Sequence, residues 1–417
     1  MFVLPEKQCN PIVSSGRLLV YYTVQGYDVP VNRDQEEAMK NVNLVQRVLC
    51  CCAMTLALPL CADTHSIAPG ATIALELKPG PGNPRNSEGA FLPLRDGRVM
   101  FAYSRYCGTS GSDYAAADIA ARYSSDKGAT WTAKDDIIVK NHGGMNVMSV
   151  SLLRLQSGEI ALFYLLKNSE KDCRPVMRRS FDEGKTWTAP TPCITDEVGY
   201  YVLNNDRVIQ LKDGRLIFPV SLHSLPDGRF SNAGEVMTYA SDDNGKTWKR
   251  GKSKHHIVVY GKLYTAQEPG VVELKDGSLM LWIRTNAGRQ YVCRSTDRGE
   301  TWSKPVPSAL CSPMSPASIK RLPTGDLLAV WNDHALDSDF MKNIKPWART
   351  PLAAAVSRDE GLTWSPSRLL EDNPDGWFCY IAIYPLDDGT VLLGYCAYDG
   401  LRHSRIVKVP VDWFYGK

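Results

Sequence analysis

Residues 124–131 read SSDKGATW, and this phrase decides the fold because it recurs along the chain. Further copies with the pattern Ser-x-Asp-x-Gly-x-Thr-Trp lie at residues 180–187, 241–248, 295–302 and 357–364. A phrase that recurs at such regular intervals along a chain is typical of stacked supersecondary units and not of an ordinary single core. The sequence therefore predicts a repeat architecture.

Each phrase has the composition of an anchored tight turn. Asp and Ser side chains can bond nearby backbone amides, Gly can adopt a positive φ, and Trp can bury a large ring against the body of its unit. We interpret the five aspartates as structural residues and not as catalytic ones (Asp126, Asp182, Asp243, Asp297 and Asp359).

Six shorter turns alternate with the long ones. Each ends in a glycine that follows a small polar residue, which is a hairpin signal (Gly97, Gly158, Gly214, Gly277, Gly325 and Gly389). Apolar runs such as residues 98–103 and 278–283 follow these turns. One unit reads strand, short turn, strand, loop, strand, long turn, strand. Four strands in each of six units predict an all-β fold, a six-bladed β-propeller.

The last unit is incomplete at the C-terminus. It has the short turn at Gly389 but no long phrase after it, and it runs out near Trp413 and Phe414. We expect residues 72–79 to supply the missing strand. Such a strand would close the ring and hide the edges that an open sheet exposes.

The N-terminal region is predicted to lie outside the propeller, which is expected over residues 63–417. Residues 39–62 contain a basic start, an apolar stretch over 48–60 and the small residue Ala62, as in a secretory signal peptide. Residues 1–38 would then be misassigned upstream sequence or a disordered extension. These features predict a secreted or periplasmic protein. A lipoprotein anchor at Cys61 is an alternative that the preceding leucine fits poorly.

Composition excludes several other classes of function. The net charge is +3 and basic tracts with interleaved aromatic residues are lacking, so no nucleic-acid partner is expected. Apolar runs stay below the roughly 18 residues that span a membrane, so no integral segment is expected after signal removal. The cysteines after residue 61 form no Cys-x-x-Cys pair. We therefore predict neither a metal nor a cofactor.

Four polar residues outside the turns stand out by their position in the repeat. Glu268 opens the first strand of a unit, and Arg284 ends the next strand sixteen residues later. Arg349 precedes the fifth long turn by ten residues, counted to its aspartate. Tyr380 precedes the last short-turn glycine by nine residues.

In this set and its spacing the chain resembles the bacterial exo-sialidase (neuraminidase) family, six-bladed propellers with repeated Asp-box turns. The resemblance covers roughly residues 80–415. It implies that Tyr380 is the nucleophile, that Glu268 is the base that accepts its proton, and that arginines hold the substrate carboxylate (Arg284 and Arg349). A neutral phenol can approach an anomeric carbon that carries a carboxylate without meeting charge repulsion. With a pKa near 10, the phenol needs such a base.

The activity implied is that of a retaining exo-α-sialidase. Such an enzyme would release terminal sialic acid, or a related 2-keto sugar acid, from a glycan or glycoconjugate through a tyrosyl-glycoside intermediate, without a metal. The family places its acid/base aspartate on the loop before the first Asp box. In this chain Asp113 is the first choice for that role, and Asp118 is the alternative.

The chain departs from the family pattern at the start of the first blade. The family has an Arg-Ile-Pro motif there, whose arginine is a third carboxylate clamp. Counting back from Gly97 places Ser87 or Glu88 at that position, with Arg85 two or three residues away. Either Arg85 compensates, or the substrate is another 2-keto sugar acid or a uronic-type sugar. A Glu88 that points inward would pair with a clamp arginine and weaken anion binding.

Two other functions remain open from the sequence. The departure at Glu88 is compatible with a propeller polysaccharide lyase or another uronate-active enzyme. A non-catalytic carbohydrate-binding propeller would also show the repeats.

Overall fold

A computed structural model describes residues 67–225, 227–335 and 339–417, together with short strands near the N-terminus. These strands form two pairs, β1 (Val13–Ser14) with β2 (Arg17–Leu18) and β3 (Val20–Val24) with β4 (Tyr27–Val31). The chain divides into two compact units, residues 1–64 and 65–417. The predicted signal peptide at 39–62 lies outside the described residues, as does the remainder of residues 1–66 apart from these strands.

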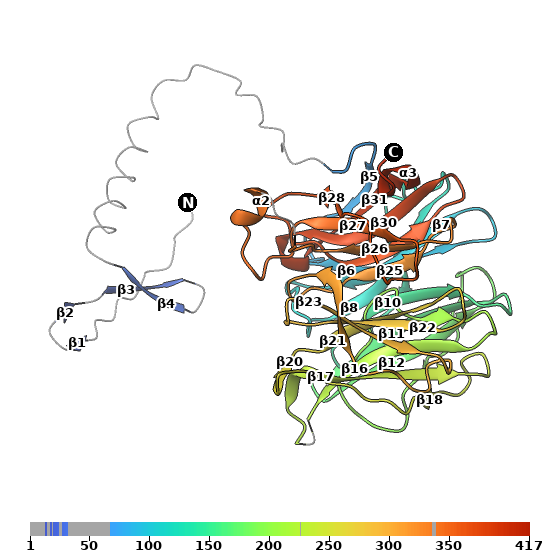
Figure 1. Cartoon of the computed structure of the whole chain (residues 1–417), viewed down its shortest axis with the longest axis horizontal. Coiled ribbons are helices and arrows are strands. Elements are labelled where there is room, and N and C mark those ends of the chain that lie inside the picture. The colour runs from blue at the N-terminus through green and yellow to red at the C-terminus, as the bar shows by residue number, and fades with distance from the viewer. Residues whose placement is uncertain are drawn as a thin grey trace, which may run out of the picture. The chain divides into compact units, whose positions relative to one another are not determined.

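Six antiparallel sheets make up the described part of the second unit (Figure 1). Blade 1 contains β6 (Asn86–Pro93), β7 (Val99–Tyr106), β8 (Ala117–Ser124) and β9 (Asp136–Val139). Blade 2 contains β10 (Asn146–Arg154), β11 (Ile160–Ser169), β12 (Asp172–Ser180) and β13 (Thr191–Pro192). Blade 3 contains β14 (Tyr201–Val202), β15 (Ile209–Gln210), β16 (Leu216–Ser224), β17 (Phe230–Ser241) and β18 (Lys249–Arg250).

The second half of the ring repeats the pattern. Blade 4 contains β21 (Gln267–Glu273), β22 (Leu279–Arg284), β23 (Arg289–Ser295) and β24 (Val306–Cys311). Blade 5 contains β25 (Ser318–Arg321), β26 (Leu327–Trp331), β27 (Leu352–Ser357) and β28 (Arg368–Glu371). Blade 6 contains β29 (Cys379–Pro385), β30 (Thr390–Tyr398), β31 (His403–Pro410) and β5 (Thr72–Leu77). The predicted six-bladed β-propeller is confirmed.

Strand β5 closes the ring, as the sequence predicted. It pairs antiparallel with β31, so that the first strand of the unit completes the last blade. In Figure 1 the blue strand β5 lies beside the red strand β31. The edge of β31 is thereby paired within the chain, and β5 is the outer strand of blade 6.

A few short elements interrupt the sheets. The hairpin of β19 (Ile257–Val259) and β20 (Lys262–Tyr264) joins blades 3 and 4. Two short helices, α2 (Asp339–Lys342) and α3 (Val411–Phe414), and the 3₁₀ turn η1 (Asp399–Leu401) lie in blades 5 and 6. Within the described ranges, no helix is long and apolar enough to cross a membrane.

The Asp-box turns share one hydrogen-bond pattern, which the turn at 241–248 illustrates. The Ser241 hydroxyl donates to Asp243 (2.7 Å) and accepts from the amide of Gly245 (2.7 Å). The amide and hydroxyl of Thr247 both donate to Asp243, at 2.9 and 2.6 Å. Gly245 has φ 79°, a conformation that residues with a Cβ resist. The box aspartates therefore serve the turns, as predicted.

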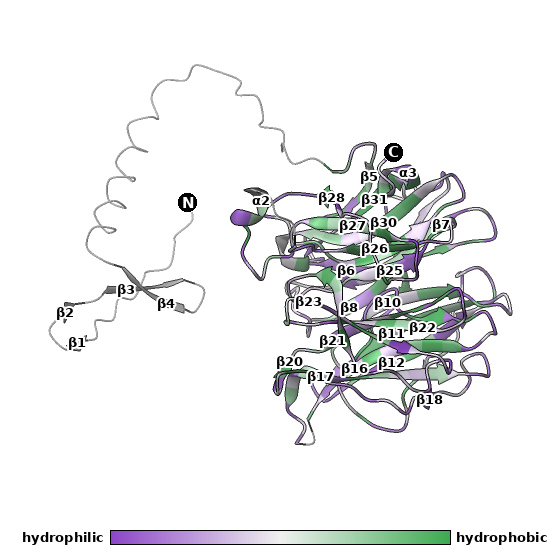
Figure 2. Cartoon of the chain, viewed as in Figure 1, coloured by the Kyte–Doolittle hydropathy of each residue, from purple (hydrophilic) through white to green (hydrophobic). Residues whose placement is uncertain are grey.

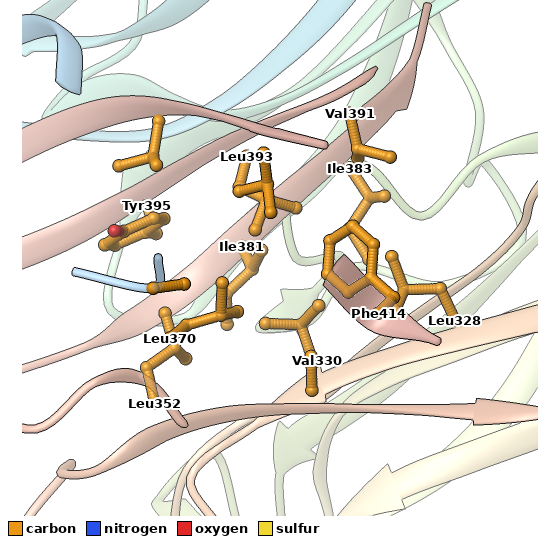
Figure 3. Packing of buried hydrophobic residues seen from close by; sticks show 14 of the residues in the cluster. Leu328, Val330, Leu352, Leu370, Ile381, Ile383, Val391, Leu393, Tyr395 and Phe414 are labelled. Carbon is orange, nitrogen blue, oxygen red and sulfur yellow. The ribbon is translucent and has the colours of Figure 1, made fainter. Parts of the chain in front are cut away.

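Apolar side chains of neighbouring blades pack against each other and hold the ring together. Figure 2 shows apolar residues concentrated on the strands, while the connecting loops are largely hydrophilic. Between blades 5 and 6, buried side chains from both sheets point toward one another (Figure 3), including Leu328, Val330, Leu352, Ile381, Ile383 and Leu393. Burial of such side chains contributes about 1.5–3 kcal/mol each.

A buried ion-pair network fastens the closing strand. Arg405 on β31 bonds Glu76 on β5 (2.6 Å) and Glu371 on β28 (2.7 Å). Tyr395 on β30 donates a further hydrogen bond to Glu371 (2.5 Å). One guanidinium thus joins the closing strand to blades 5 and 6.

We expect Arg405→Met to lower the free energy of unfolding by roughly 3 kcal/mol, because it leaves the buried Glu371 carboxylate without its cation. Urea denaturation measures this change. The matched control is Arg229→Met, which breaks an ion pair whose arginine is 77% exposed and so costs about 1 kcal/mol or less. Equal losses in the two variants would contradict the role of the network in closure.

Candidate active site

A cavity of about 290 Å³ opens at one end of the blades. Its polar lining comes from several blades and includes Glu88, Asp113, Lys167, Glu268, Arg284, Arg349 and Tyr380. The structure therefore brings together five of the six predicted site residues. The sixth, Arg85, is not among the described residues that line the cavity.

Four first strands carry a β-bulge where they reach the cavity. The register shifts in β6, β10, β21 and β29, and in each bulge a non-glycine residue adopts a positive φ. These residues are Glu88 (φ 58°), Ser149 (61°), Glu268 (46°) and Tyr380 (59°). All four line the cavity. Bulges re-aim side chains and concentrate near functional sites, where such backbone strain is retained.

Tyr380, Glu268 and Arg284 form a hydrogen-bonded chain in this cavity. The Tyr380 hydroxyl donates to Glu268 Oε1 (3.2 Å), and Arg284 Nη1 donates to Glu268 Oε2 (2.5 Å). One oxygen of the carboxylate thus faces the phenol and the other faces a fixed cation. The arginine keeps Glu268 oriented toward the phenol.

Burial and the facing carboxylate of Glu268 raise the pKa of Tyr380 well above its usual value. The resting side chain is therefore a neutral phenol. It can act as a nucleophile only if its proton leaves during the reaction, and the carboxylate at 3.2 Å is placed to take it.

Arg349 supplies a cation that the protein leaves partly unbonded. Its Nη1 atom is buried and has no hydrogen-bond partner among the described residues. The guanidinium carbon lies 5.5 Å from the centre of the Tyr380 ring and 5.4 Å from that of Trp377. A buried guanidinium with a free N–H is costly unless a ligand supplies an acceptor.

Arg85 is buried, contacts the cavity residues Asp113 and Glu88, and is already engaged. Its Nη1 donates to Asp113 Oδ1 (2.5 Å), its Nε donates to the Ser87 hydroxyl (3.0 Å), and its guanidinium packs 4.4 Å from the ring centre of Tyr106. Of the three predicted clamp arginines, Arg284 and Arg349 line the cavity and Arg85 does not. The bulge after Ser87 turns Glu88 toward the cavity.

The two predicted acid/base candidates differ in position. Asp113 lines the cavity, and its main-chain carbonyl is held by Asn146 Nδ2 (2.8 Å) and Lys167 Nζ (2.7 Å). Burial acts to raise the pKa of the Asp113 carboxyl, but the attraction and hydrogen bond of Arg85, together with the charges of Lys167 and Arg349, lower it below its usual value. Asp118 is bound by Lys140 and by the amide of Asn141, and it is not among the described residues that line the cavity.

Glu88 points inward and pairs with Arg85, one of the three predicted clamp arginines, as the sequence suggested. Its Oε2 lies 3.5 Å from Arg85 Nη2 and accepts a hydrogen bond from the Ser87 hydroxyl (3.2 Å). Burial raises the pKa of Glu88 to about 7, against the attraction of Arg85. The negative charges of Asp113 and Glu268 contribute to the rise.

We expect Glu88→Gln to stabilise the protein at pH 8 but not at pH 4.5. A carboxyl whose folded pKa is raised loses stability as the pH rises from 4.5 through about 7, because the buried group must then carry charge. The shift amounts to roughly 3 kcal/mol at about 1.4 kcal/mol per pKa unit. Thermal denaturation at the two pH values measures the difference.

In the control variant the expected change in stability at pH 8 has the opposite sign, because the pKa of the replaced carboxyl is lowered and not raised. Hydrogen bonds lower the pKa of Asp243 to about 2 despite partial burial, so Asp243→Asn should destabilise the protein at pH 8 and have little effect near pH 2. A Glu88→Gln variant less stable than the parent protein at pH 8 would contradict the charge assignment.

Neither Lys167 as a cavity residue nor the hydrogen bonds that Asn205 makes to other blades were predicted from the sequence. Lys167 is buried in the cavity wall, with Nζ 5.1 Å from the ring centre of Tyr114 and 5.4 Å from that of Tyr200. It lies opposite Asn146, before the bulge of blade 2, as Arg284 lies opposite Gln267 before the bulge of blade 4. Comparison of the second strands of the blades could have found it.

The repeats and the fold agree with what is known of similar proteins. Residues 97–393, which include all five Asp-box phrases, match the family described as BNR repeat-like domain. The chain belongs to this family. Family membership accounts for the Asp-box turns. It does not define the chemistry of the cavity, which depends on the residues that line it.

Curated relatives of this BNR repeat-like chain include sialidases. A sialidase from Bacteroides fragilis (strain YCH46) is 32% identical over 230 residues, which cover 52% of this chain and 38% of the relative. A sialidase from Micromonospora viridifaciens is 28% identical over 241 residues, covering 54% of this chain and 34% of the relative. The chain spans less than half the length of these two curated relatives.

Solved structures show the same fold at low sequence identity. A Hadza microbial sialidase, Hz136, superposes with a TM-score of 0.64 at 20% identity and covers 79% of this chain and 66% of its own. A Trypanosoma rangeli sialidase in complex with the inhibitor DANA gives a TM-score of 0.64 at 17% identity, covering 84% and 61%. At these identities the likeness establishes the propeller fold alone.

Proposed function

We propose that the protein is a retaining exo-glycosidase of the sialidase type that removes a terminal 2-keto sugar acid from a glycan. The contact that carries this proposal is the hydrogen bond of the Tyr380 hydroxyl to Glu268, in a cavity that the buried Arg349 also lines. A neutral phenol on a fixed carboxylate is suited to attack at a carbon that bears a negative substituent.

The first step forms a covalent glycosyl-enzyme. The Tyr380 oxygen attacks the anomeric carbon as the bond to the leaving-group oxygen breaks, and Glu268 takes the phenolic proton. A carboxyl group of blade 1 gives a proton to the leaving-group oxygen. Sequence resemblance suggested Asp113 for this donor.

The second step reverses the first with water in place of the aglycone. The blade 1 carboxylate takes a proton from water, the water oxygen bonds to the anomeric carbon, and the tyrosyl bond breaks as Glu268 returns the proton to the phenolate. Two displacements at one carbon retain its configuration.

Arg349 and Arg284 are proposed to bind the substrate carboxylate. Arg284 Nε, like Arg349 Nη1, is buried without a hydrogen-bond partner among the described residues. A planar guanidinium can offer paired N–H donors to a carboxylate, which an ammonium cannot. Two cavity arginines in place of three favour a wider choice of sugar acids than sialic acid alone.

A screen of 4-methylumbelliferyl glycosides tests the proposal, with sialic acid, other 2-keto sugar acids and uronic acids as the sugars. We expect fluorescence release from at least one 2-keto sugar acid, with the α-anomer of the sugar as first product by NMR. Unsaturated products that absorb in the ultraviolet would instead indicate a lyase. Sugar binding without turnover would indicate a binding module, and either result would overturn the proposal.

A further inference from the structure

We infer that Glu88, and not Asp113, is the acid/base residue that protonates the leaving-group oxygen and later deprotonates the attacking water. This inference rests on the proposed function and names a further catalytic residue for it. It assigns the role to a residue at the position where the chain departs from the family motif.

The first observation is the matching placement of Glu88 and Tyr380. Each occupies the left-handed position of a bulge, Glu88 in β6 and Tyr380 in β29, and each lines the cavity. The two strands belong to the neighbouring blades 1 and 6. The bulges therefore present a carboxyl and a phenol from adjacent blades to the same cavity.

The second observation is that one side chain fastens the two bulges together. Asn205 Nδ2 donates to the carbonyl of Gly89 (2.7 Å) and to the carbonyl of Tyr380 (3.0 Å). The backbone after Glu88 and the backbone of Tyr380 thus share one amide nitrogen. This bridge holds the backbones of the two bulges close together, so that the Glu88 carboxyl and the Tyr380 phenol enter the cavity from adjoining positions.

The third observation concerns Asp113, whose carboxylate is already bonded. Arg85 Nη1 donates to Asp113 Oδ1 at 2.5 Å, so the group is held in its charged form and has no proton to give. Glu88 meets the same guanidinium only at 3.5 Å. Arg85 therefore interacts more strongly with the carboxylate of Asp113 than with that of Glu88.

The charges that face Glu88 leave it able to exchange a proton. Arg85 and Lys167 attract its negative form, whereas Asp113, Glu268 and burial oppose it, and the pKa settles at about 7. Paired carboxyl groups whose pKa values are driven apart identify the acid and the permanently charged partner. In this pair Asp113 is the charged partner, which neutralises and positions Arg85.

The proton steps balance with these roles. In the first step the Glu88 proton moves to the leaving-group oxygen as its bond to the anomeric carbon breaks and the bond to Tyr380 forms. In the second step the Glu88 carboxylate takes a proton from water as the water oxygen replaces Tyr380. Glu88 ends protonated, as it began.

The test compares Glu88→Gln with Asp113→Asn on two glycosides of the sugar acid that the enzyme hydrolyses. One is a 4-methylumbelliferyl glycoside, whose leaving group needs little protonation, and the other is a methyl glycoside, which needs a proton. For Glu88→Gln we expect kcat/KM to fall about 10³-fold on the methyl glycoside and about tenfold or less on the aryl glycoside. Azide should raise the turnover of the aryl glycoside by this variant and yield a glycosyl azide.

For Asp113→Asn we expect similar losses on both glycosides and no azide effect, as for a residue that positions Arg85. The ratio of the two losses within one variant does not depend on how much of it folds. Substrate-dependent loss and azide rescue in Asp113→Asn, with equal losses in Glu88→Gln, would overturn the inference. An unmutated protein that hydrolyses neither glycoside would refute the proposed function itself, and the inference with it.

Discussion

Tyr380→Phe is expected to lower kcat at least about 10³-fold on any glycoside that the enzyme hydrolyses, because it removes the atom that forms the covalent bond. The change leaves the ring and its packing in place. It removes one hydrogen bond to Glu268, which keeps its bond to Arg284, so the stability should change by only about 1 kcal/mol. Initial rates and thermal denaturation of the same preparation measure both effects.

A buried tyrosine elsewhere in the propeller provides the control. The Tyr164 hydroxyl bonds Arg178 (2.7 Å) and His142 (2.8 Å) and is not among the described residues that line the cavity. Tyr164→Phe should cost a similar amount of stability and leave kcat unchanged. Turnover by Tyr380→Phe at the rate of the parent protein would exclude the tyrosine as nucleophile.

Arg349→Met is expected to raise KM, and the Ki of a carboxylate-bearing transition-state analogue, about 10²-fold. Loss of a charge-assisted hydrogen bond in a buried site costs roughly 3 kcal/mol of binding. The same variant should unfold at a temperature close to or above that of the parent protein, because a buried cation with an unbonded N–H is removed. Titration calorimetry measures the affinity for the analogue, and thermal denaturation measures the unfolding temperature.

The variant Arg349→Lys separates charge from geometry. A lysine keeps the positive charge but lacks the planar pair of donors, so we expect it to recover only part of the lost affinity. An Arg349→Met variant that binds the carboxylate analogue as tightly as the parent protein would place the anion site elsewhere in the cavity.

The repeats made the fold predictable before the structure. The Asp-box phrase needs no tertiary context, because its hydrogen bonds run within eight residues, as the turn around Asp243 shows. The closing strand could be predicted too, since the last unit lacked one strand and residues 72–79 lie shortly before the first unit. The register of the first strand in each blade was harder to predict from the sequence.

The site was predictable where a residue kept its interval from a turn. Glu268 lies nine residues before Gly277 and Tyr380 nine before Gly389, and Glu88 lies nine before Gly97. The structure shows why, since each is the left-handed residue of a bulge at the same height in its blade. Simple strand alternation cannot place a bulged side chain. Counting from the sequence therefore reached Ser87 or Glu88, with Arg85 two or three residues away as a possible replacement.

Contacts between distant parts of the chain could not be predicted from spacing. The ion pair of Arg85 with Asp113 joins the residue before β6 to the loop between β7 and β8, and Asn205 bridges blades 1 and 6 from blade 3. Such contacts arise only when the ring closes. They decide which carboxyl group carries a proton, which the residue types alone do not reveal.

The central claim is that a covalent bond forms at Tyr380, and a trapping experiment tests it most directly. A 2,3-difluoro derivative of the sugar acid that the enzyme hydrolyses should form the glycosyl-enzyme faster than it is released. Mass spectrometry of the digested protein is then expected to find the sugar mass on the peptide that contains Tyr380, and to find none in Tyr380→Phe. A label on another residue, or turnover of the inhibitor without any label, would contradict the mechanism.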